Sequence, residues 1–137
     1  MFVVVDTLTC WWPVKVLEPH PTRVGVVVEH EFEVEFEILD REENKVLQDM
    51  RAAILKEAAE IGGDDAIAQA ERKLEEHDEE AFRRVLRNWR KIVDQNKAEI
   101  PFTLENLSRV LTRDHVRAAI NRAYQDAISQ DKARRKN

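Results

Sequence analysis

Strict alternation of apolar and acidic residues marks the first part of the chain. From Val24 to Ile38 the even positions are apolar apart from one histidine, and the odd positions from Glu29 to Glu37 are all glutamates. Successive side chains of a strand point to opposite faces. The pattern therefore predicts a strand with one apolar face and one carboxylate face.

A second β-prone run precedes this strand. Residues 12–17 are rich in apolar and β-branched side chains, and Pro19 and Pro21 separate them from the alternating stretch. Two prolines so close together do not continue a sheet interior, so a loop is expected between the runs. The two runs predict an antiparallel hairpin, to which residues 1–7 could add a third strand.

The periodicity changes after Asp40, where apolar residues begin to recur at three- and four-residue steps. Such spacing places them on one side of a helix. Gly62 and Gly63 are expected to end this helix, and Asp64 or Asp65 to cap the next one. The apolar positions of the first helix are Val46, Leu47, Met50, Ile54, Ala58 and Ile61.

Helical periodicity continues through residues 65–94. Residues 65–76 are rich in alanine and glutamate, with one lysine, a composition that favours a weakly amphipathic helix. A stronger apolar stripe follows, and the pattern leaves open whether one helix or two cover the range. The stripe consists of Phe82, Val85, Leu86, Trp89, Ile92 and Val93.

The last two helices are predicted from their capping residues. Thr103 and Asp114 each stand before a short run of apolar residues with helical spacing. Together the elements predict a single α+β domain over 1–130, with an N-terminal antiparallel β-hairpin in 1–40 and a mainly α-helical bundle of four to five helices in 41–130. Residues 131–137 lack an apolar anchor and are expected to form a flexible basic tail.

Composition narrows the function classes. Of 137 residues, 43% are hydrophobic and 36% charged, and the formal net charge is −5. This acidity argues against a nucleic-acid coat, and no apolar run is long enough to span a membrane. The single cysteine, Cys10, cannot form an internal disulfide and suits a reducing cytoplasm. Three glycines are too few to form a glycine-rich phosphate-binding loop.

No constellation predicts catalysis or metal binding. His30-Glu31 begins like a zinc-protease motif, but Val34 stands where the second histidine would be. We expect His30 to be half-buried in its strand, His77 to lie on a charged helical surface, and His115 in a first helical turn. The glutamate row is interpreted as a solvated sheet face, with an acid–base pair or a docking face for a basic partner as alternatives. No catalytic residue, metal or cofactor is therefore expected.

Protein-interaction candidates come from two places. Trp11 and Trp12 are adjacent, so in a strand they point to opposite faces, and the exposed one is an interface candidate. In the basic tail the candidates are Arg134, Arg135 and Lys136; the tail could contact nucleic acid or could equally keep an exposed helix end soluble. Tail-only binding of nucleic acid would be weak and sensitive to salt.

Four segments of the chain stand in an order that carries a family resemblance. They are W-P-V-K-V at 12–16, E-F-E-V-E-F-E-I-L at 31–39, W-R-K-I-V-D followed by I-P-F-T-L-E-N-L within 89–107, and V-R-A-A-I-N-R-A-Y-Q-D-A with A-R-R-K-N within 116–137. In this order the chain resembles the tail assembly chaperones of long-tailed (siphovirus-type) bacteriophages. Where that family usually has glycine after the tryptophan and in the following loop, this chain has Arg90 and Lys97.

This resemblance implies a non-catalytic role in virion morphogenesis. The protein would bind the tape measure protein in the host bacterial cytoplasm, keep it soluble, help recruit tail tube subunits, and be absent from the mature virion of a phage or prophage. A longer frameshifted form of the protein commonly accompanies the short one in this family. Acidic residues near 29–43 and basic ones at 131–137 would also permit a homo-oligomer.

A different class remains open from the residues themselves. The two capped helices after Thr103 and Asp114 have the lengths of a small helix-turn-helix-like DNA-binding regulator. Arg113, Arg117 and Arg122 could face phosphates in such a protein, although Asp114 and Asp126 dilute their charge.

Overall fold

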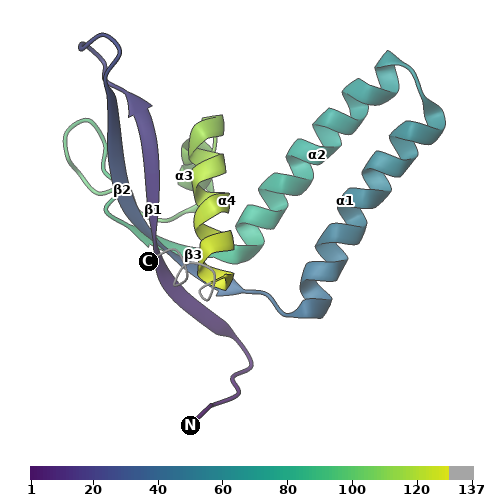
Figure 1. Ribbon diagram of the computed structural model, residues 1–137, viewed down its shortest axis with the longest axis horizontal. Helices are drawn as coiled ribbons and strands as arrows, with labels where there is room; N and C mark the ends of the chain where they lie inside the picture. The colour runs from purple at the N-terminus through teal and green to yellow at the C-terminus, as the bar shows by residue number, and fades with distance from the viewer. Residues whose placement is uncertain (130–137) are drawn as a thin grey trace. The chain divides into compact units, whose positions relative to one another are not determined.

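The computed structural model describes residues 1–129. It confirms the α+β fold with an N-terminal antiparallel β-hairpin, followed within the described residues by four helices and one further strand (Figure 1). The tail residues Arg134, Arg135 and Lys136 lie outside this range. The elements are β1 (Leu8–Pro19), β2 (Val27–Ile38), α1 (Arg41–Ile61), α2 (Asp64–Val85), β3 (Leu86–Arg90), α3 (Leu104–Val110) and α4 (Asp114–Ile128).

The chain divides into two compact units, where the sequence suggested one domain over 1–130. Within the described residues the sheet unit comprises 1–37 and 86–129, and the hairpin unit comprises 38–85. The sheet unit holds all three strands with α3 and α4, and the hairpin unit holds α1 and α2. The hairpin unit is thus inserted between β2 and β3.

A loop shaped by its own histidine joins β1 to β2. Pro19 ends β1, and the backbone N–H of His20 donates to the carbonyl of Val26 at 2.7 Å. The ring Nδ1 of His20 accepts from the backbone N–H groups of Thr22 and Arg23, at 3.2 and 3.0 Å. The predicted loop between the two β-prone runs is therefore confirmed.

The third strand differs from the sequence-based prediction. Residues 1–7 form no strand, whereas 86–90, which the periodicity assigned to a helix, form β3. The sheet order is β1-β2-β3, and β3 pairs antiparallel with β2. Trp89 lies opposite Val34 in this pairing, and both side chains are buried. One helix and one strand therefore share the range 65–90.

A bulge explains why this strand resembled a helix. The register shifts between Glu35 and Phe36, so that Phe36 pairs with Leu86 and Arg87 is left as the extra residue. The bulge lets Leu86 and Trp89, three positions apart, both be buried. A spacing of three is what a helix would also give, which made the two structures indistinguishable by pattern.

The core of the sheet unit packs aromatic rings edge to face. The rings of Phe36 and Tyr124 lie 5.3 Å apart, and α4 packs on β1. Trp89 packs against Phe102 at 4.9 Å and donates its Nε1–H to the carbonyl of Ile100 at 2.7 Å. Trp89 is therefore a core residue, as predicted. The largest fully buried side chains are Val14, Val34, Phe36, Leu107 and Ile120.

The two last helices begin differently. Thr103 is the N-cap of α3, as predicted, and its hydroxyl accepts from the backbone N–H of Asn106 at 3.1 Å. The expected cap at Asp114 is wrong, because Arg113 occupies the N-cap position of α4 without a side-chain cap and Asp114 is already in the first turn. There its carboxylate still favours the helix dipole.

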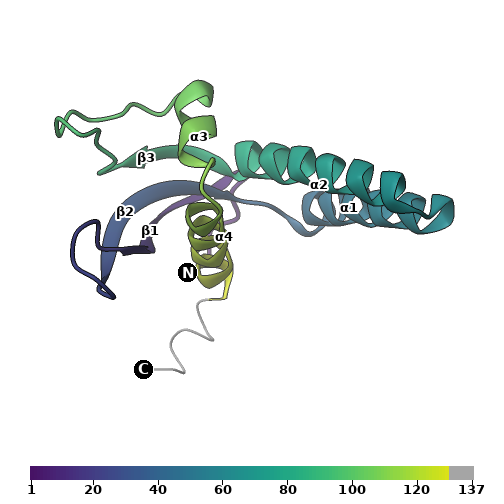
Figure 2. The same ribbon diagram turned by 90° about the horizontal axis from the view of Figure 1, so that it is seen from above.

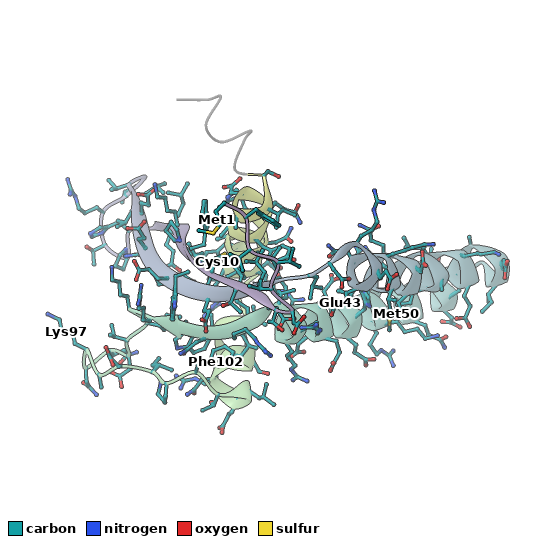
Figure 3. All side chains as sticks on the ribbon, turned by 90° about the horizontal axis from the view of Figure 1, so that it is seen from below. Met1, Cys10, Glu43, Met50, Lys97 and Phe102 are labelled. Atoms are coloured by element: carbon teal, nitrogen blue, oxygen red, sulfur yellow. The ribbon has the colours of Figure 1, made fainter. Side chains whose placement is uncertain are left out.

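A lysine adopts glycine-like backbone geometry in the loop after β3. Lys97 has φ 63°, at one of the two positions where the resemblance leads us to expect glycine (Figure 3). Asp94 supports this turn, because its carboxylate accepts from the backbone N–H groups of Asn96 and Ala98 at 2.8 and 3.0 Å. At the other position Arg90 ends β3, and the next residue, Lys91, has φ 69°.

The hairpin unit consists of two helices that run side by side (Figure 2). Asp40 caps α1, since its carboxylate accepts from the backbone N–H of Glu43 at 2.8 Å. Gly62 ends α1 with φ 71°, and its N–H donates to the carbonyl of Ala58 at 2.9 Å. The predicted stop at the glycine pair is confirmed, and Asp64 opens α2 as its first residue.

Candidate protein-interaction surface

Helix α1 leaves its apolar side chains largely uncovered. It has 21 residues and buries none of them. Val46, Met50 and Ile61 are 57%, 52% and 65% exposed, and Ile54 is half-buried. Steps of four, four and seven residues put these four on one side of the helix. We call them the α1 stripe; Figure 3 labels Met50 in it, and Glu43, seven residues earlier, on the same side.

A groove between α1 and α2 continues the α1 stripe. Ile54 and Ile61 of the stripe line it, and Ala66 and Ala70 of α2 are the buried residues on its opposite wall. Because both alanines are buried, their small side chains let α1 and α2 approach each other closely. The residues lining the groove are Ile54, Glu57, Ala58, Ile61, Ala66, Gln69, Ala70 and Lys73.

Ion pairs link the side chains of α1 and α2. Nζ of Lys73 lies 3.5 Å from Oε2 of Glu57, beside the groove. Nη1 of Arg51 lies 2.6 Å from Oδ1 of Asp78. All four side chains are about half exposed, so each pair adds little to stability. Their contribution is to fix which residues of the two helices lie side by side.

The acidic surplus of the protein resides in the hairpin unit. Residues 38–85 contain 14 acidic and 8 basic residues, a net charge of −6, whereas the whole chain has −5. The apolar surface of α1 is thus carried by the negatively charged unit. Charge of one sign around an apolar surface selects partners of the opposite sign.

A cation–π contact lies on the outer face of the sheet. The guanidinium of Arg90 stands 4.1 Å from the ring centroid of Trp11, which is 37% exposed. Arg90 also pairs with Glu33, which lies opposite it on β2. Trp12, the second tryptophan candidate, is half-buried. Sequence reasoning missed Arg90 because its partners come from two other strands.

The glutamate row is only partly a solvated face. Glu29 and Glu31 are exposed, as predicted, but Glu37 is buried and pairs with Arg87 at 3.1 Å. Hydrogen bonds from Arg90 and Lys91 hold the pKa of Glu33 below its ordinary value. Basic residues of β3, and the lysine that follows it, therefore pair with two of the five glutamates, Glu33 and Glu37.

The four histidines do not gather into a metal site. His30 is exposed and His77 is buried, so both predictions for them were wrong, whereas His115 lies in the first turn of α4 as predicted. Glu18 of β1 lies between two of them, with Oε2 2.8 Å from Nε2 of His115 and Oε1 3.6 Å from Nε2 of His30. Among residues 1–129 no set of three potential ligands has a metal-binding arrangement.

Cys10 has the environment of an unreactive thiol. It is half-buried, and burial raises its pKa, with a smaller contribution from the carboxylate of Glu35. A raised pKa lowers the fraction of thiolate, which is the nucleophilic form.

The arginines that would face phosphates in a helix-turn-helix-like DNA-binding protein are not equally accessible. Arg113 and Arg122 are exposed, but Arg117 is half-buried and its Nη1 lies 3.5 Å from the carbonyl of Leu111. The first helix of the pair, α3, has seven residues. α4 buries Ala119, Ile120, Ala123, Tyr124 and Ala127.

Comparison with known proteins identifies no relative. A scan against protein-family models gives no match, and searches of curated proteins and of solved structures give no significant match. Of the helices within the described residues, none combines the length and apolarity needed to cross a membrane.

Proposed function

We propose that this protein is a tail assembly chaperone of a long-tailed phage, a non-catalytic protein that binds the tape measure protein and keeps it soluble. The observation that carries the proposal is the α1 stripe, an apolar surface on a 21-residue helix with no buried residue. A chaperone of a long helical protein needs such a surface, because amphipathic helices dock by laying their apolar side on another apolar surface. The segments that resemble the family lend independent support.

The remaining partners belong to the same proposal. The complex with the tape measure protein would form in the host bacterial cytoplasm and would help to recruit tail tube subunits. A longer frameshifted form of the chain would act beside the short one, and neither would remain in the mature virion. Many copies along one tape measure protein could each bind weakly, since linked contacts add through multivalency.

Co-expression tests the proposal directly. The tape measure protein encoded in the same genome is expressed alone and together with this chain, and its soluble fraction is measured. We expect the soluble fraction to rise at least several-fold on co-expression, and the two proteins to co-purify through a tag on either one. Equal insolubility in both cultures, with no co-purification, would refute the proposed function.

A further inference from the structure

We propose that the α1 stripe and the adjoining groove bind one amphipathic helix whose apolar side is flanked by lysine and arginine. The inference rests on the proposed function for the setting in which such a helix is met. From Val46 to Ile61 the α1 stripe covers fifteen residue steps, or about 22 Å of helix. A partner helix of about four turns matches this length.

The mouth of the groove lies beside the exposed residues of the α1 stripe. Ala66 and Ala70 form its wall on α2, and Ile54 and Ile61 form its wall on α1. A third helix that lay on the α1 stripe, along the mouth of the groove, would cover the exposed parts of Met50 and Ile61.

Charges beside the α1 stripe define the partner's flanks. Glu42 and Asp49 stand seven residues apart, along the side of α1 next to Val46 and Met50. Both are exposed, and neither forms an ion pair with another residue of the described chain, whereas Glu60 on the same side already pairs with Lys56. Lysine or arginine on the partner helix would pair with these carboxylates.

The same charges disfavour a second copy of α1 as the occupant. Two α1 stripes packed in parallel would bring Glu42 and Asp49 of one copy close to the same carboxylates of the other, and an antiparallel packing centred on the stripe would bring Asp49 close to Glu57. Like charges in an interface are repulsive, and the hairpin unit already carries a net charge of −6. A basic amphipathic helix removes this repulsion, which is why we assign the surface to a different chain.

Two synthetic peptides test the assignment with the full-length protein. Both are 18-residue amphipathic helices with the same leucine stripe, one flanked by lysines and the other by glutamates, each with a fluorophore for anisotropy titration. We expect the lysine peptide to bind at least tenfold more tightly than the glutamate peptide, and its affinity to fall as salt rises. Equal affinity for the two peptides would overturn the proposal.

Matched variants locate the binding surface. The double variant Val46→Glu/Met50→Glu should weaken lysine-peptide binding at least tenfold. Its control is Gln48→Glu/Ala52→Glu, which adds two negative charges to α1 away from the stripe and should bind as the natural protein does. Circular dichroism checks the helix content of each variant. If the glutamate variant does not fold, Val46→Ala/Met50→Ala replaces it, because alanine keeps a high helix propensity. Unchanged binding by both stripe variants would refute the site.

Charge reversal tests the flanks separately. Glu42→Lys/Asp49→Lys should reverse the preference, so that the glutamate peptide becomes the tighter ligand. Glu71→Lys/Glu75→Lys makes the same charge change on exposed residues of α2 and should keep the original preference. If both reversals shift the preference equally, the effect is one of net charge and the flank assignment fails.

The result is separable from the proposed function. If the tape measure protein becomes soluble with Val46→Glu/Met50→Glu as well as with the natural chain, the chaperone role stands and this surface is wrong. If the lysine peptide binds the α1 stripe but the tape measure protein stays insoluble, the surface stands and the chaperone role is wrong.

Discussion

Glu18 and His115 lie 97 positions apart in the chain, yet Oε2 of the carboxylate is 2.8 Å from Nε2 of the imidazole. The contact ties the end of β1 to the first turn of α4, the helix that packs on that strand. Both side chains are more than 40% exposed. The two residues therefore form a surface pair. Its effect is to orient α4 on β1, and it buries little additional surface.

We expect His115→Ala to lower the free energy of unfolding by about 0.5 kcal/mol, since exposed pairs contribute in this range. A double-mutant cycle with Glu18→Gln, measured by urea denaturation, isolates the coupling. His30→Ala should show weaker coupling to Glu18, because its Nε2 is 3.6 Å from that carboxylate. Purely additive effects of the Glu18 and His115 substitutions would show that the pair is not formed in solution.

Arg90→Gln should raise the pKa of Glu33 toward its ordinary value. The side-chain hydrogen bond from Arg90 is the largest cause of the lowered pKa, and that from Lys91 comes next. A carboxyl whose pKa is lower in the folded state stabilises the fold above its unfolded pKa, and loses this effect as pH falls through the folded value. The stability difference between the natural protein and the variant should thus be present at neutral pH and shrink in acid.

Carbon-detected NMR titration of the Glu33 carboxyl measures this shift directly. Glu29→Gln serves as the control, because Glu29 is exposed and remote in register from Arg90. A Glu33 titration that is the same with and without Arg90 would contradict the assigned cause.

Trp89→Ala should lower the free energy of unfolding by about 3–5 kcal/mol, as for other buried aromatic residues. The residue is 6% exposed and packs on Phe102. Trp89→Phe keeps an aromatic ring but leaves the carbonyl of Ile100 without its indole donor, and should cost about 1–3 kcal/mol. Thermal and urea denaturation measure both, with exposed Lys15→Ala as the neutral control. A loss below about 1 kcal/mol for Trp89→Ala would place this residue outside the core.

Cys10 should react slowly with iodoacetamide in the folded protein. Burial is the main cause of its raised pKa, and Glu35 adds to it. We expect Glu35→Gln to increase the alkylation rate at pH 8 modestly and urea to increase it much more, because unfolding removes the larger cause. If the folded Glu35→Gln variant reacted as fast as the unfolded chain, the carboxylate of Glu35, and not burial, would be the larger cause of the raised pKa.

Local patterns predicted the elements that depend on neighbours in sequence. The hairpin, the helix end at Gly62 and the cap at Thr103 each arise from residues within a few positions of one another. The strand β3 could not be found this way, because its bulge gives Leu86 and Trp89 a helical spacing and its pairing partner lies more than fifty residues earlier. Non-local pairing overrides a local preference.

The candidate surface was visible in the sequence only as a helix stripe. Val46, Met50, Ile54 and Ile61 have the spacing of an apolar helix side, which ordinarily predicts burial. Burial depends on what packs against that side, and α2 covers only part of it. His77 is the opposite case. Its charged sequence context predicted a surface position, but the side chain is buried.

The insertion of residues 38–85 between two paired strands makes the length of α1 and α2 independent of the strand pairing in the sheet. The chain leaves the sheet just after Phe36 and returns at Leu86, its partner in the ladder. Whole turns could be added to or removed from α1 and α2 without altering any strand contact. The length of the helical hairpin can therefore change without any change in the strand pairing of the sheet unit.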